Sequence, residues 1–78
     1  MIVFTKHALE RMKQRAITRD EVIRAVNTSK KRLTDSLGHS IVQLEDNGKV
    51  LRVFYVEREK DIIVITAYKT SKEKYRTK

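Results

Sequence analysis

Several residue types are missing or scarce in this chain of 78 residues. It has no cysteine, which excludes disulfides, thiolate metal sites and cysteine nucleophiles. Proline is also absent, and glycine occurs only at Gly38 and Gly48, so we expect regular secondary structure over most of the chain. Apolar runs such as Ile62 to Ile65 are far too short to cross a membrane. We therefore expect one small cytoplasmic domain, residues 1–78, with no signal peptide and no membrane contact.

Positive charge is the dominant compositional feature. Lysine and arginine number 18 against 10 acidic residues, which gives a net charge of +8. On so small a domain, this excess predicts a polyanionic partner: nucleic acid first, then an anionic membrane or an acidic protein. The C-terminal segment 69–78 carries five basic residues and one acidic residue, and it is expected to be a flexible tail.

Two amphipathic helices are predicted in the first third of the chain. The first runs from Lys6 to Ala16 behind the N-cap Thr5, with an apolar stripe that faces the core. Beside this stripe, the spacing i, i+4, i+8 places three basic residues along one side of the helix: His7, Arg11 and Arg15. The second helix begins with a capping box of Thr18 and Glu21 and ends near residues 27–29.

From residue 32 onward, the pattern changes to the period of β-strands. The turn Asp46-Asn47-Gly48 predicts a hairpin in which Ser40 faces Tyr55, and a second hairpin at residues 58–61 leads to a strand over 62–68. The fold class is therefore α+β, with an N-terminal helical hairpin packed on a three- to four-stranded antiparallel β-sheet.

The predicted sheet has two unlike faces. We expect the helices to pack on one face, formed by Ile41, Phe54, Val56, Ile63, Ile65 and Ala67. The other face would be open to a ligand and would carry Ser40, Tyr55, Thr66 and Tyr68 among Val42, Leu44, Val53 and Val64. A slip of one residue in the second hairpin would exchange the two faces.

No cofactor or metal motif is present, because the acidic residues lie at a helix start and in turns and the two histidines lie in different elements. We expect no metal and no cofactor. Metal-free cleavage of RNA stays open, since the substrate supplies its own 2′-hydroxyl nucleophile and the protein needs only a proton-transfer group and cationic donors. The candidates are His7 for proton transfer; Arg11 and Arg15 for the phosphate; Tyr55, Thr66, Tyr68 and Lys69 to orient it; and Arg52, a charge in mid-strand.

Each candidate also has an ordinary structural interpretation. Arg11 and Arg15 can simply solvate an exposed helix face, while Tyr55 and Tyr68 suit strand packing. Thr66 suits a strand by its propensity alone. Charge indicates a preference for polyanions, and it does not by itself indicate chemistry.

Two segments make the sequence resemble a known family: Phe4-Thr5-Lys6-His7-Ala8-Leu9-Glu10-Arg11-Met12, and Arg15-Ala16-Ile17-Thr18-Arg19-Asp20-Glu21-Val22. Together with the closing strand Ile63 to Tyr68, they resemble the small bacterial and phage family called domain of unknown function 4258. One departure is Ala16, where that family often has glycine. The family looks related to the barnase, EndoU, colicin and RelE group of metal-independent ribonucleases, many of them toxins.

The resemblance implies a RelE-like domain with His7, Arg11 and Arg15 on a helix and Thr66 and Tyr68 on the last strand. On this basis we expect a metal-independent endoribonuclease, the toxin of a toxin–antitoxin system, acting on mRNA, tRNA or ribosome-associated RNA. Its partner would be an acidic antitoxin protein. Two alternatives remain: a non-catalytic RNA- or DNA-binding module, and a protein-interaction adaptor.

Overall fold

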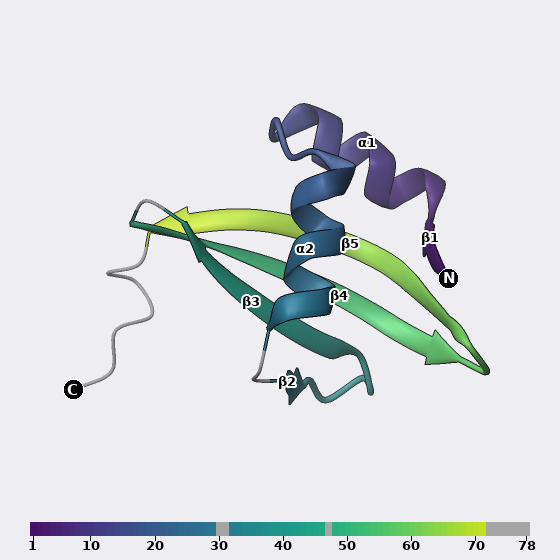
Figure 1. Ribbon diagram of the computed structural model, residues 1–78. Helices are drawn as coiled ribbons and strands as arrows, with labels where there is room; N and C mark the ends of the chain where they lie inside the picture. Colours follow the sequence, from purple (N-terminus) through teal and green to yellow (C-terminus); the bar gives the residue numbers. More distant parts are fainter. Residues whose placement is uncertain (30–31, 47, 72–78) are drawn as a thin grey trace.

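The computed structural model describes residues 1–29, 32–46 and 48–71. The elements follow the order β1 (Ile2–Phe4), α1 (Lys6–Gln14), α2 (Arg19–Thr28), β2 (Arg32–Thr34), β3 (Ser40–Asp46), β4 (Lys49–Arg58) and β5 (Asp61–Ser71). Both helices pack on one face of a curved sheet, and no described helix covers the opposite face (Figure 1). No helix in these ranges is long and apolar enough to cross a membrane.

The sheet has five strands in the order β1-β5-β4-β3-β2. The α+β class and the helical hairpin are confirmed, but the expectation of three or four purely antiparallel strands is wrong. The first strand joins the sheet, and it runs parallel to β5 with Ile2 opposite Ile62. Its addition leaves β5 between two neighbours, which suits a strand that is rich in apolar residues. Ile2, Phe4 and Ile62 all pack against the core, which explains why so short a strand is held there.

Helix α1 starts where the sequence predicts but ends two residues earlier. The hydroxyl of Thr5 accepts a hydrogen bond from the backbone N–H of Ala8 at 3.0 Å and donates one to the carbonyl of Val64 at 3.1 Å. At the other end Ala16 has φ 55°, and the Ile17 N–H donates to the Met12 carbonyl at 2.9 Å. This is a Schellman motif, with Ile17 and Met12 both buried as its hydrophobic contact. The left-handed residue ends the helix.

Replacing Ala16 with glycine should stabilise the fold, because only glycine adopts a positive φ without a steric cost from Cβ. We expect the free energy of unfolding in urea to rise by about 1 kcal/mol. The control is Lys13→Gly, an exposed site inside α1, where the same residue should cost about 1 kcal/mol. Destabilisation by both variants would contradict the role assigned to the Ala16 conformation.

Helix α2 carries the predicted capping box. The Thr18 hydroxyl accepts from the Glu21 N–H at 3.1 Å, and the Glu21 carboxylate accepts from the Thr18 N–H at 2.9 Å. Val22 and Ala25 supply its fully buried positions, next to Ile17 at the helix entry. The chain therefore enters α2 in a fixed direction toward β3 and β4.

The predicted register of the first hairpin is confirmed. Asp46 is opposite Lys49, and Ser40 is opposite Tyr55. Gly48 has φ 79°, while Asn47 lies outside the described residues. In the second hairpin Arg58 is opposite Asp61, and β5 then continues to Ser71. Residues 69–71 of the expected tail thus belong to the sheet, and residues 72–78 lie outside the described part.

The predicted assignment of the two sheet faces is wrong in most positions. The core under the helices contains Val42, Leu51, Val53, Tyr55, Val64 and Ala67, of which Val42, Val53, Tyr55 and Val64 were expected on the open face. Conversely, Phe54 lies on the face away from the helices, because side chains alternate along β4. The ladder between β4 and β5 shifts at Phe54 and Tyr55, so that Thr66 is opposite Phe54 but Val64 is opposite Tyr55. This β-bulge at Ile65 sends Val64 to the core and leaves Thr66 and Tyr68 on the open face.

Candidate functional site

Three basic side chains follow one another along the surface of α1. His7, Arg11 and Arg15, which we call the α1 ridge, are all exposed. The Arg11 Nε–H donates to His7 Nε2 at 3.4 Å. Arg15 Nη1 donates to the carbonyl of Ala67 at 2.9 Å, which ties the end of α1 to β5. The ridge therefore holds an imidazole and a guanidinium in contact, with a second guanidinium further along the same helix.

Some basic groups of the protein are neutralised by ion pairs, and the α1 ridge is not among them; exposed side chains such as Arg24 and Arg58 are likewise without a described ion pair. Arg32 pairs with Glu57 at 3.1 Å, and Lys69 pairs with Glu21 at 2.8 Å. Among the described residues, no carboxylate forms an ion pair with any of the three ridge side chains. Exposed cations of this kind are available to an external anion.

A second group of candidate side chains lies on the face of the sheet that the helices leave open. Arg52 Nη1 donates to the hydroxyl of Tyr68 at 2.7 Å. The rings of Phe54 and Tyr68 stack with centroids 5.9 Å apart, and the Arg52 guanidinium lies 5.5 Å and 5.7 Å from those centroids. Thr66 is opposite Phe54 in the ladder. These four half-buried residues, Arg52, Phe54, Thr66 and Tyr68, form the open-face cluster.

The structure thus divides the predicted site residues between the two sides of the sheet. His7, Arg11 and Arg15 belong to the helical layer, and Lys69 lies on that side too, in its ion pair with Glu21. Thr66, Tyr68 and Arg52 belong to the opposite face. Tyr55 is 1% exposed and packs in the core, with the Arg32 guanidinium 5.8 Å from its ring centroid. The predicted residues therefore do not form one compact constellation.

Strand β5 connects the two groups. The carbonyl of Ala67 accepts from Arg15 on the helical side, and the next residue, Tyr68, carries its ring on the open face. Strand β1 pairs with β5 only at Ile62, Ile63 and Val64, so within the described residues no strand covers this edge further along. The α1 ridge and the open-face cluster consequently meet at the uncovered part of the β5 edge. Phe54 is the member that sequence reasoning missed, because it was expected on the face that packs against the helices.

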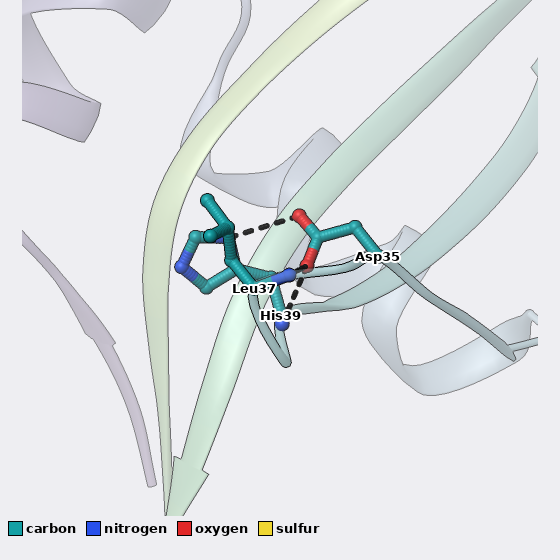
Figure 2. Close-up of polar contacts among 3 residues, drawn as sticks. All are labelled: Asp35, Leu37 and His39. Carbon is teal, nitrogen blue, oxygen red and sulfur yellow. Dashed lines mark hydrogen bonds and ion pairs between the residues drawn. The ribbon is translucent and has the colours of Figure 1, made fainter.

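The second histidine lies far from this edge, in the loop between β2 and β3. Figure 2 shows the carboxylate of Asp35 turned toward the loop, where its Oδ1 accepts from the N–H groups of Leu37 at 2.9 Å and His39 at 2.8 Å. Its Oδ2 lies 3.1 Å from His39 Nδ1. Partial burial alone would raise the pKa of Asp35, but the hydrogen bonds from these backbone N–H groups outweigh it and lower that pKa. His39 thus has a structural role in closing this loop.

Acid should destabilise the protein through two carboxylates. The Lys69 side chain and the Thr18 N–H lower the pKa of Glu21, and the pKa of Asp35 is lowered as described. A carboxyl with a lower pKa when folded contributes stability that is present above its unfolded pKa and lost as the pH falls through the folded value. We therefore expect the free energy of unfolding in urea to fall below about pH 4.

The same pH series on Glu21→Gln and Asp35→Asn variants checks the origin of this loss. Each variant should be less stable than the wild type at pH 7 and should show a smaller decrease toward pH 3. A decrease as large as that of the wild type in both variants would contradict the assignment to these two groups.

In the described residues, no group of three or more histidine, aspartate or glutamate side chains could hold a metal ion. The family described as Domain of unknown function (DUF4258) matches residues 4–69, a range that includes the α1 ridge and the open-face cluster. The family resemblance expected from the sequence is therefore confirmed, while the wider resemblance to the ribonuclease group stays a prediction. No curated protein and no solved structure matches the chain.

Proposed function

This chain belongs to the DUF4258 family, and we propose that it is an RNA-binding protein whose phosphate contacts are made by the α1 ridge. The observation that carries the proposal is the alignment of three exposed basic side chains along one side of α1, where no described carboxylate neutralises them, in a chain of net charge +8. Arginine donates to phosphate oxygens in a bidentate fork, so Arg11 can hold one phosphate while keeping its contact with His7.

The first test is equilibrium binding of a fluorescently labelled RNA in EDTA over a series of salt concentrations. Because phosphate contacts release counterions, the logarithm of the affinity should fall linearly with the logarithm of the salt concentration. The same measurement with DNA of equal length and sequence determines whether the partner is RNA in particular. Affinity that is absent at low salt, or does not change with salt, would overturn the proposal.

A second candidate function is metal-independent cleavage of RNA, and the contact between His7 and Arg11 favours it. A neutral imidazole beside a guanidinium can remove the proton of a 2′-hydroxyl while the guanidinium holds the adjacent phosphate. The 2′-oxygen then bonds to phosphorus, and the bond to the 5′-oxygen breaks as that oxygen takes a proton from water. The products are a 2′,3′-cyclic phosphate and a 5′-hydroxyl. Only RNA has the nucleophile for this reaction.

Cleavage is tested by incubating total RNA with the purified protein in EDTA and analysing the fragment ends. Fragments should end in 2′,3′-cyclic phosphate, and His7→Ala should lower the rate by about 100-fold or more, the usual size of an acid–base contribution. The matched control is His39→Gln, because His39 lies in the distant β2–β3 loop and should be dispensable for cleavage. Cleavage by His7→Ala at the wild-type rate would remove His7 from the reaction.

The toxin interpretation extends this second candidate. An acidic segment of an antitoxin would neutralise the α1 ridge, which forms no described ion pair of its own. Expression of the wild-type protein alone should then arrest growth, and expression of His7→Ala at the same level should not. Normal growth with the wild-type protein would leave RNA binding without a toxin role.

A further inference from the structure

We propose that the open face of the sheet binds unpaired bases of single-stranded RNA, which stack on the rings of Phe54 and Tyr68. This inference rests on the proposed RNA binding and adds the form of the RNA and a second surface. The α1 ridge explains contacts with phosphates, which every nucleic acid offers. Aromatic rings on a sheet face select bases that are not already paired.

The geometry of the open-face cluster supports stacking. Phe54 and Tyr68 come from neighbouring strands, and their rings are inclined by only 30° with centroids 5.9 Å apart. Both side chains are half-buried, so each is held by its strand while part of it stays accessible. The two rings stack on one another, and a base can add to this stack where a ring face is left uncovered. No element of the core requires these rings, because the core lies on the other face.

Arg52 gives the open-face cluster its charge. Its guanidinium lies against both rings and donates to the Tyr68 hydroxyl at 2.7 Å, which fixes it at the centre of the cluster. A planar cation in this position can stack on a base or donate to a phosphate. An apolar partner would have to desolvate the Arg52 guanidinium, whereas a nucleic acid strand complements a chain of net charge +8. Charge complementarity therefore favours RNA over an apolar protein segment as the occupant.

The path between the two surfaces also favours a flexible single strand. Arg15 reaches the Ala67 carbonyl from the helical side, and Tyr68 follows directly on the open face. A strand whose phosphates lie along the α1 ridge can thus pass over the uncovered edge of β5 and place its bases on the cluster. A stiff A-form duplex has its bases paired inside and cannot bend around one edge of a sheet.

The decisive experiment uses the absence of tryptophan from the chain. A Phe54→Trp variant carries a single tryptophan in the cluster, and a Leu37→Trp variant carries one in the β2–β3 loop, where Leu37 is 79% exposed. Each is titrated with single-stranded oligouridylate and with an RNA duplex, and anisotropy of labelled RNA confirms binding. We expect single-stranded RNA to quench Phe54→Trp strongly, and to leave Leu37→Trp unchanged.

A second measurement guards against an effect of the tryptophan itself. Phe54→Leu and Tyr68→Leu should each lower affinity for oligouridylate by about 5-fold or more and leave affinity for the duplex unchanged. Thermal unfolding of both variants confirms that they fold. RNA binding without quenching at position 54, or equal losses for single-stranded and duplex RNA, would overturn the inference and leave the proposed function intact. Absence of all RNA binding would overturn both.

Discussion

Replacing Tyr55 with alanine is expected to lower the free energy of unfolding by about 3–5 kcal/mol. Tyr55 is 1% exposed and is among the largest fully buried side chains of the protein. Its removal leaves a cavity between α2 and the sheet, next to Val22 and Val53 in the same core cluster. Small domains are stable by about 5–15 kcal/mol, so this loss brings the protein close to unfolding at ordinary temperature.

Urea denaturation followed by circular dichroism measures this effect. The control is Leu37→Ala, an exposed loop position at which the change should stay within about 0.5 kcal/mol. A Tyr55→Phe variant keeps the buried ring and should bind RNA as the wild type does, because the structure places this side chain in the core and away from any phosphate. A Tyr55→Ala protein as stable as the wild type would contradict the position of Tyr55 in the core.

Features that depend on local spacing could be predicted from the sequence. The capping box of Thr18 and Glu21 and the pairing of Asp46 with Lys49 each need only a few neighbouring residues, and both are present. The alignment of His7, Arg11 and Arg15 is local in the same way, because helical periodicity alone places them on one side of α1.

Features that depend on pairing between distant segments could not be predicted. The bulge between β4 and β5 changes which residues of β5 face the helices after Ile65, and no local sequence pattern predicts this bulge. For that reason the contact of Arg52 with Phe54 and Tyr68 was not predicted. Arg52 itself was a candidate, because it is a charge in mid-strand. The parallel pairing of Ile2 with Ile62 likewise joins the two ends of the chain.

Reversing the charge of the α1 ridge should have the largest effect on binding. The double variant Arg11→Glu and Arg15→Glu replaces two donors to phosphate by two groups that repel it. We expect affinity for a single-stranded RNA at low salt to fall by more than about 100-fold, since each contact to a charged group is worth about 1.5–3 kcal/mol. The slope of log affinity against log salt should also decrease by about 1.4, because a single strand gives about 0.7 per contact.

The matched control for this variant changes the net charge by the same amount elsewhere. Arg24 on α2 and Arg58 at the end of β4 are both exposed and lie outside the ridge and the cluster. The variant Arg24→Glu and Arg58→Glu should lose less than about tenfold in affinity and keep its salt slope, since only distant charge is altered. Equal losses in the two double variants would mean that net charge, and not the ridge, determines binding.

The most direct test of the central claim is to locate bound RNA on the protein by NMR. A ¹⁵N-labelled sample is titrated with a single-stranded RNA oligonucleotide in EDTA, and the shifts of the backbone amides are mapped onto the structure. The account predicts the largest shifts along α1 from His7 to Arg15 and along β5 after Val64. Shifts confined to α2 and the β2–β3 loop, or no shifts at saturating RNA, would contradict it.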